Sequence, residues 1–260
     1  MMFTDEANPA FVRLAGHPLR WRLLTELAES DRRVRELVEV AGQPQNLISY
    51  HLRLLRGGGL VTAHRSSFDA RDSYYHLDLE GCALALNAVG IALHPALRLA
   101  PTPPSATSAE RPVRPRVLFA CTGNSARSPI AEALLRHRAD GHVEVVSAGS
   151  HPKPRIHPNA ARVLREQYGI DIADHLPRHL NTLARRHFEY VISLCDKVRE
   201  VCPEFSDQPR LIHWSIPDPA AGDTDRQSYP AFRRTAAEID TRIRYLLPVL
   251  TDTPELELQP

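Results

Sequence analysis

The sequence predicts an α/β protein in two parts: a C-terminal four-stranded parallel sheet flanked by helices, preceded by a mainly helical unit. Three observations support this fold class. After residue 115, short apolar segments alternate with helical patterns, as in a parallel sheet. Residues 101–115 are rich in proline and can neither form a helix interior nor pack a core. Before them, helical periodicities precede a hairpin pattern. We therefore expect domains at 1–100 and 116–250, with a linker at 101–115 and a tail at 251–260.

Composition limits the class of protein. The 260 residues carry a formal net charge of +1, so a DNA-binding face would have to be local. Four cysteines are too few for a disulfide-stapled secreted protein, and the start of the chain has no signal-peptide pattern. The longest apolar run, Cys82 to Leu93, is too short to span a bilayer. We expect a cytoplasmic protein with reduced thiols and no membrane partner.

The first 100 residues contain three helical patterns and a hairpin. Residues 18–27 place leucines on one face, residues 33–40 form a second short helix, and residues 45–56 form a third that ends at three glycines. Two strand-like segments, 60–65 and 73–77, flank a polar turn. A helix, a helix-turn-helix and a hairpin in this order are typical of a winged helix-turn-helix domain.

Residues 9–98 resemble the ArsR-type repressor family in three segments: Leu-Ala-Gly-His-Pro-Leu-Arg near the start, Ile-Ser-Tyr-His-Leu in the third helix, and Gly-Gly-Gly-Leu-Val before the hairpin. The resemblance implies a third helix in the major groove of double-stranded operator DNA, a wing on the backbone or minor groove, and a homodimer built by terminal helices. By this resemblance, the candidates for contact with bases or phosphates are Gln45, Asn46, Ser49, Tyr50 and His51. Candidate phosphate contacts are Arg53, Arg56, His64, Arg65 and Arg71. The alternative is that these residues form an ordinary solvated face.

The family's metal-sensing Cys-x-Cys motif is missing here. Residues 36–42, before the third helix, contain no thiol, and Cys82 is the only cysteine in this half. A single cysteine on an apolar helix is more often a core residue than a ligand. The effector of this half is therefore open.

In the C-terminal half, strands are expected at Arg116–Cys121, Val143–Ser147, Phe188–Leu194 and Arg210–Trp214. Helices are expected at Ser128–Arg138, Asn159–Tyr168 and Tyr229–Leu247. Between the first strand and helix lies a loop that begins at Cys121 and ends at Ser128. Such a loop points backbone N–H groups and the helix dipole at one spot, which favours an oxyanion and lowers the pKa of a cysteine there. Arg127 adds a planar bidentate donor.

Residues 116–250 resemble the low-molecular-weight tyrosine phosphatase fold and, more closely, the arsenate reductases built on it. The resemblance implies that Cys121 is the nucleophile, Arg127 the oxyanion clamp, Ser128 the thiolate partner and Asp218 the general acid. The oxyanion would lie against the loop residues Thr122, Gly123, Asn124, Ser125, Ala126 and Arg127. Asn124, Glu132 and Ser147 match positions that surround a potassium ion in some reductases, so a potassium site is a further expectation.

Two further cysteines distinguish a reductase from a phosphatase. Cys195 and Cys202 are too far apart for a CxxC pair and lack the other ligands of a zinc site. The resemblance implies a relay: Cys121 attacks arsenate, Cys195 attacks the Cys121 sulfur and releases arsenite, and Cys202 closes onto Cys195. An external thiol reductant, thioredoxin or a low-molecular-weight thiol, would then reset the enzyme, which needs no tightly bound cofactor.

Two alternatives remain open. The first is a phosphatase fused to a regulator, which needs Cys121 but not the other two thiols. Pro129 after Ser128 is more typical of phosphatases, while Ala126 replaces a cysteine seen in some reductases and phosphatases. Against it, Ala-Ala-Gly rather than tyrosine follows the Asp218-Pro219 pair. The second is a repressor whose C-terminal half only binds an oxyanion or arsenite as effector.

Overall fold

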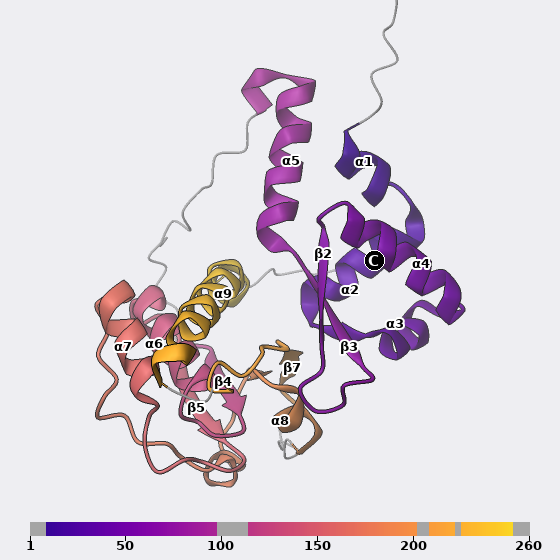
Figure 1. Ribbon diagram of the computed structural model, residues 1–260. Coiled ribbons are helices and arrows are strands. Elements are labelled where there is room, and N and C mark those ends of the chain that lie inside the picture. The colour runs from indigo at the N-terminus through magenta and orange to yellow at the C-terminus, as the bar shows by residue number, and fades with distance from the viewer. Residues whose placement is uncertain (1–8, 98–113, 202–207, 222–224, 252–260) are drawn as a thin grey trace, which may run out of the picture. The chain divides into compact units, whose positions relative to one another are not determined.

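The computed structural model describes residues 9–97, 114–201, 208–221 and 225–251. By its internal contacts the chain divides into two compact units, residues 1–103 and 104–260 (Figure 1). The expected linker lies outside the described residues except for Arg114 and Pro115, and so does the expected tail apart from Thr251.

The first unit is mainly helical. Its helices are α1 (Ala10–Ala15), α2 (Pro18–Glu29), α3 (Val34–Ala41), α4 (Gln45–Gly57), α5 (Leu79–Leu93) and a 3₁₀ turn at Pro95–Leu97. Its strands are β1 (Arg32–Arg33), β2 (Val61–Arg65) and β3 (Ser73–Leu77), in the antiparallel order β1-β3-β2. The helix-turn-helix and hairpin expected from the sequence are thus present. The sequence patterns indicated neither α1 nor the two-residue β1.

Helical spacing of leucines builds the core of this unit. Leu23, Leu24 and Leu27 lie on the buried side of α2, and Ile48 and Leu52 on the buried side of α4. The α3–α4 turn needs Gly42, whose φ of 62° is left-handed and ends α3. This turn sets the angle at which α4 crosses the unit.

The second unit contains a four-stranded parallel sheet, as predicted. Its strands are β4 (Arg116–Cys121), β5 (Glu144–Gly149), β6 (Tyr190–Ser193) and β7 (Arg210–His213), in the order β5-β4-β6-β7. Its helices are α6 (Arg127–Ala139), α7 (Pro158–Tyr168), α8 (Asp196–Val201) and α9 (Asp225–Thr251), with a 3₁₀ turn at Leu180–Leu183. The short helix α8 was not expected.

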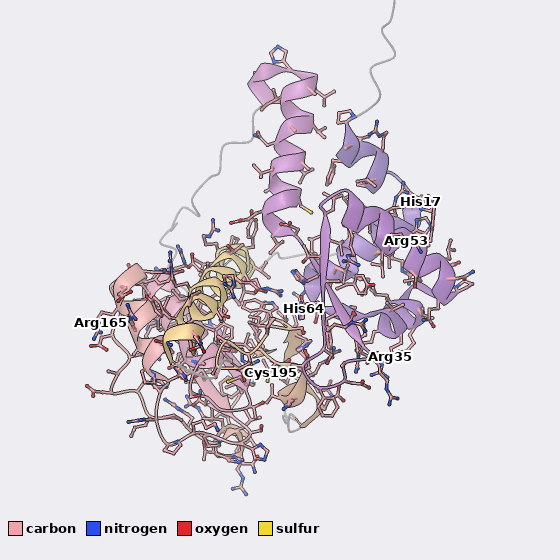
Figure 2. The ribbon with its side chains drawn as sticks, in the orientation of Figure 1. His17, Arg35, Arg53, His64, Arg165 and Cys195 are labelled. Atoms are coloured by element: carbon pink, nitrogen blue, oxygen red, sulfur yellow. The ribbon has the colours of Figure 1, made fainter. Side chains whose placement is uncertain are left out.

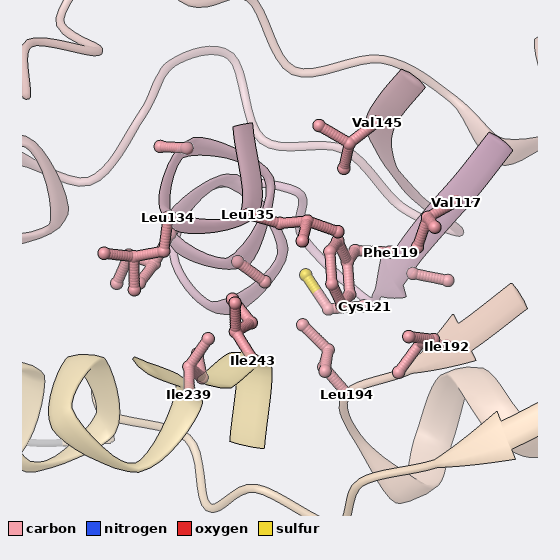
Figure 3. Packing of buried hydrophobic residues seen from close by; sticks show 14 of the residues in the cluster. Val117, Phe119, Cys121, Leu134, Leu135, Val145, Ile192, Leu194, Ile239 and Ile243 are labelled. Atoms are coloured by element: carbon pink, nitrogen blue, oxygen red, sulfur yellow. The ribbon is translucent and has the colours of Figure 1, made fainter. Parts of the chain in front are cut away.

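Part of the core of the second unit lies between the sheet and the pair α6 and α9, which contact each other. Leu134 and Leu135 of α6 and Ile239 and Ile243 of α9 belong to the same buried cluster as Phe119 of β4 (Figure 3). The register places the ends of β4 and β5 together, since Cys121 pairs with Gly149. The carboxyl ends of parallel strands are where such sheets bind ligands. Among the described residues, no helix is both long and apolar enough to cross a bilayer.

Candidate functional sites

The loop after β4 curls around a point above the end of the sheet. The carbonyls of Thr122, Gly123 and Ser125 accept hydrogen bonds of 2.8–2.9 Å from backbone N–H groups of residues 151–157. In a trans peptide the next N–H points away from the carbonyl. The N–H groups of residues 123, 124 and 126 therefore point to the opposite side, and that of Asn124 donates to Cys121 Sγ at 3.3 Å. Such a row of N–H groups is an anion-binding concavity.

Asn124 holds the shape of this loop. Its φ of 43° is left-handed, a conformation that asparagine tolerates better than most residues. Its Oδ1 accepts from the backbone N–H of Arg178 at 2.8 Å, which fixes the orientation of the amide. Its Nδ2 then donates both hydrogens, to Ser128 Oγ at 3.0 Å and to Ser147 Oγ at 2.8 Å.

Ser128 lies between this amide and the sulfur of Cys121. Its Oγ is 2.9 Å from Cys121 Sγ and already accepts a hydrogen bond from Asn124. The hydroxyl hydrogen of Ser128 is therefore available to the sulfur, and donation to Sγ stabilises a thiolate more than a thiol. This is the arrangement expected from the sequence for Cys121 and Ser128.

The pKa of Cys121 differs from the sequence-based expectation. The loop and helix start predicted a lowered value, but Cys121 is buried among apolar side chains at the end of β4 (Figure 3). Burial raises its pKa above the ordinary value, and nearby Cys195 adds to the rise. The Arg127 guanidinium and the Ser128 hydrogen bond act in the opposite direction. Local motif reasoning missed this because desolvation depends on the whole core.

Arg127 and Asp218 meet at the open side of the loop. Arg127 donates from Nη1 to the carbonyl of Ile216 at 2.9 Å, and its Nη2 lies 3.4 Å from Asp218 Oδ2. The Nε of Arg127 is buried and has no hydrogen-bond partner among the described residues. A free buried donor beside the N–H concavity fits an oxyanion ligand. Asp218 is half exposed and reaches the same place from the segment after β7.

A second thiol adjoins the loop. Cys195 follows β6 (Figure 2) and is buried. Its Sγ lies 3.3 Å from Thr122 Oγ1. The presence of Cys195 also contributes to the raised pKa of Cys121. Cys202, the third thiol expected in the relay, lies outside the described residues.

The three residues expected around potassium are brought together behind the loop. Ser147 Oγ donates to Glu132 Oε2 at 2.6 Å and accepts from Asn124. Glu132 is buried, and its other oxygen accepts from Arg136 Nη2. His175 Nε2 lies 3.5 Å from Glu132 Oε2; burial lowers the pKa of this histidine, against the opposing effect of Glu132. Within the described ranges, no cluster of three or more His, Cys, Asp or Glu residues could hold a metal ion.

Sequence reasoning missed a buried polar network beside the second thiol. His213 Nδ1 lies 2.8 Å from Ser193 Oγ and its Nε2 lies 3.2 Å from Asp196 Oδ1. Ser215 Oγ donates to the same carboxylate oxygen at 2.5 Å. The network joins the start of α8, next to Cys195, to the segment that leads to Asp218. The alternation of His213 and Ser215 around an aromatic residue was the only signal in the sequence.

In the first unit, α4 presents a polar face. The exposed residues of this helix include Gln45, Asn46, Tyr50, Arg53 and Arg56, while Ser49 is half-buried. On the hairpin, His64 is half-buried, and Arg65 and Arg71 are exposed. Figure 2 labels Arg53 and His64 on α4 and β2. Nine of the ten candidate DNA contacts are therefore at least partly accessible.

His51 is the exception. It is only 5% exposed and its ring lies 4.6 Å from that of His17. Burial lowers the pKa of His51, and the nearby His17 and Arg20 lower it further. The helical period turns position 51 towards the core with Ile48 and Leu52. His51 is therefore placed as a core residue and not as the DNA contact expected from the sequence.

Cys82 is half-buried on α5, and burial, with a contribution from Asp78, raises its pKa to about 11. This agrees with a core thiol and not with a reactive or metal-ligating one.

Comparisons with known proteins agree with these two units. Residues 116–256 match the family model of the low molecular weight phosphotyrosine protein phosphatases, and residues 17–63 match that of bacterial regulatory proteins of the arsR family. An arsenate reductase of Halalkalibacterium halodurans is 33% identical over 129 residues, which are 49% of this chain and 91% of that protein. An arsenate reductase of Bacillus subtilis is 30% identical over 129 residues, again 49% and 91%.

Among solved structures, the arsenate reductase from Archaeoglobus fulgidus is 30% identical, with 50% of this chain and 98% of that chain covered and a TM-score of 0.42.

Proposed function

The chain belongs to the low molecular weight phosphotyrosine protein phosphatase family and carries an arsR-family helix-turn-helix domain; from this premise we propose that it is a thiol-dependent arsenate reductase fused to an operator-binding regulator. The relatives named arsenate reductase support the choice of substrate. The observation that carries the proposal is the second buried thiol: a phosphatase needs only Cys121, yet Cys195 lies against the same loop.

In the proposed first step, the Cys121 thiolate attacks the arsenic atom of arsenate. The loop N–H groups and Arg127 bind the charged oxygens, and Asp218 protonates the departing oxygen, which leaves as water. The product is an arsenic(V) adduct on the Cys121 sulfur. Ser128 donates to that sulfur before and after the attack.

In the second step, the Cys195 thiolate attacks the sulfur of Cys121. A disulfide forms, the sulfur–arsenic bond breaks, and its electron pair stays with arsenic, which leaves as arsenite. Cys202 then attacks Cys195, forming a Cys195–Cys202 disulfide and returning Cys121 as thiolate. An external dithiol of the thioredoxin type, or a low-molecular-weight thiol, reduces this disulfide.

The regulator half of the proposal rests on the exposed polar face of α4. Asn and Gln read adenine and Arg reads guanine in the major groove, and all three residue types lie on this face. We place the protein in the cytoplasm, where operator DNA is found.

A homodimer is part of the proposal, because α5 exposes several large apolar side chains. They are Leu84, Leu86, Ile91 and Leu93. An apolar hollow beside them is lined by Phe11, Val12, Trp21, Leu86 and Val89. Large apolar side chains that are exposed beside such a hollow are typical of a protein–protein interface.

Arsenate reduction by the purified full chain, with thioredoxin or a low-molecular-weight thiol as alternative reductants, tests the enzyme. We expect Cys121→Ser, Cys195→Ser and Cys202→Ser each to abolish multiple turnover, and the control Cys82→Ser to leave it unchanged. Undiminished turnover in Cys202→Ser would refute the relay. Hydrolysis of aryl phosphates that survives loss of both Cys195 and Cys202 would identify a phosphatase instead. Arsenical-dependent release from operator DNA without any turnover would identify a sensor.

A further inference from the structure

A chain of short contacts links the nucleophile to a charged surface residue. It runs from Cys121 Sγ to Ser128 Oγ at 2.9 Å and from Ser128 to Asn124 Nδ2 at 3.0 Å. From Asn124 it continues to Ser147 Oγ at 2.8 Å, and from Ser147 to Glu132 Oε2 at 2.6 Å. The last contact is the ion pair between Glu132 and Arg136. All members except Arg136 are buried.

A buried carboxylate requires a compensating charge. Glu132, at the far end of this series of contacts, is only 1% exposed. Removal of its counter-charge would weaken the hydrogen bond that it accepts from Ser147. Arg136, one helical turn further along α6, supplies a cation directly on Glu132. The same Nη2 donates to the carbonyl of Val145 at 3.1 Å, two residues before Ser147 on β5. The guanidinium therefore ties α6 to the strand that carries Ser147.

The oxygens that a potassium ion would need are already engaged. Asn124 offers its amide nitrogen to this cluster, because its oxygen accepts from the backbone of Arg178. Ser147 Oγ accepts from that nitrogen and donates to Glu132. Each oxygen of Glu132 has its own partner, Ser147 or Arg136. Hard cations bind several free oxygen ligands, so the residues present do not fit a potassium ion.

We propose that Arg136 takes the place of a monovalent cation at Glu132, so that the oxyanion loop of this protein is held in shape by its own guanidinium and does not depend on potassium. Arginine carries its charge at every physiological pH, and its fixed position requires no ion to be captured. Arg136 is a positioning residue: it acts on Cys121 only through Glu132, Ser147, Asn124 and Ser128. The inference rests on the proposed role of Cys121 as nucleophile.

The variant Arg136→Met tests the proposal, because it removes the charge and retains an apolar stem. Arg162→Met is its matched control. Arg162 likewise pairs with a glutamate four positions away on a helix, Glu166 of α7, but both partners of that pair are exposed. A second variant, Arg136→Lys, retains the charge.

Two readouts are taken on the full chain in chlorides of potassium, sodium and tetramethylammonium at equal ionic strength. They are the thermal unfolding midpoint of the second unit and the rate at which iodoacetamide alkylates Cys121, followed by mass spectrometry. Neither requires arsenate chemistry, so failure of the reductase assignment would not affect them. Initial rates of turnover are a third readout.

For the wild type, Arg136→Lys and Arg162→Met, we expect neither the midpoint nor the alkylation rate of each protein to change from one salt to another. In tetramethylammonium chloride, iodoacetamide should alkylate Cys121 of Arg136→Met about tenfold more slowly. This is the effect expected when a hydrogen bond to a charged group loses its support. Potassium should restore most of that rate and raise the midpoint by a few degrees, since a ligand stabilises the state that binds it.

Three results would overturn the proposal. The first is a wild type whose unfolding midpoint is higher, or whose rates are several-fold higher, in potassium than in tetramethylammonium. This result can be observed even if Arg136→Met fails to fold. The second is an Arg136→Met variant that behaves like Arg162→Met. The third is a loss in Arg136→Met that no monovalent cation restores.

Discussion

The hydroxyl of Thr122 lies 3.3 Å from the sulfur of Cys195, so the first residue of the oxyanion loop contacts the thiol at the end of the neighbouring strand. The two residues are 73 positions apart in sequence. The parallel pairing of β4 with β6, which places Ala120 opposite Ser193, brings them together. This contact positions the second thiol against the residue that follows Cys121, without any local motif.

The variant Thr122→Val should slow the second step of the proposed reaction. A hydrogen bond of this kind contributes about 1 kcal/mol, which corresponds to about a fivefold lower rate of arsenite release. Rapid-quench measurement of arsenite in a single turnover checks this. Thr182→Val, which alters an exposed threonine on the 3₁₀ turn, is the control. Equal slowing of adduct formation in Thr122→Val would contradict an effect on Cys195.

Ser128→Ala should make Cys121 a weaker nucleophile. The hydroxyl of Ser128 favours the thiolate form of Cys121. Loss of this hydroxyl therefore raises the pKa of Cys121, which burial has already raised. Hydrogen bonds to charged groups contribute about 1.5–3 kcal/mol, so alkylation of Cys121 at neutral pH should slow about tenfold or more. Rates measured against pH should show the whole profile displaced to higher pH.

Ser125→Ala is the matched control for that experiment, because Ser125 lies in the same loop and, among the described residues, its hydrogen bond is made by the backbone carbonyl, which accepts from His157. The interpretation fails if both alanine variants displace the profile equally.

Gly149→Ala should damage the oxyanion loop. A Cβ at Gly149 would lie 2.6 Å from the carbonyl oxygen of Thr122 and 2.9 Å from the backbone nitrogen of Asn124, so backbone must move. Overpacking of this kind costs about 1–3 kcal/mol, and the displaced N–H groups should bind oxyanions at least tenfold more weakly. Arsenate or phosphate protection of Cys121 from alkylation measures that affinity.

Gly57→Ala is the control, because a Cβ at position 57 would meet nothing within 4 Å. Gly57 is the last residue of α4. The stability of this variant should be equal to or above that of the wild type. An unchanged affinity in Gly149→Ala would show that the loop accommodates the methyl group.

The first unit should lose stability in acid through His51. Its pKa is lowered in the folded state by burial, and further by His17 and Arg20, so below its ordinary pKa of about 6.5 the unfolded chain binds more protons. The free energy of unfolding should therefore fall as the pH drops below that value towards the lowered one. Denaturation followed by Trp21 fluorescence in a Trp214→Phe background isolates this unit.

His51→Leu should flatten this pH dependence, while His94→Gln, which alters an exposed histidine of the same unit, should retain it. A pH dependence that survives in His51→Leu would assign it to another group.

Much of the fold was predictable because its signals are local. The run from Val117 to Ser128 combines an apolar strand, a turn and a helix start in twelve neighbouring residues, so both the loop and its chemistry follow from sequence. The helix-turn-helix was equally local. The helix α8 was missed because six residues carry too little periodicity to identify a helix.

The residue types of the site follow from the order of residues 121–128: a cysteine, an arginine and a serine at fixed spacing in a strand-to-helix loop. Their environment depends on tertiary structure, because burial and long-range contacts depend on which strands pair. Tertiary structure raised the pKa of Cys121 and set Cys195 against Thr122. It also set Glu132, which already pairs with Arg136 along α6, against Ser147 of β5, where the family resemblance had suggested a potassium ion.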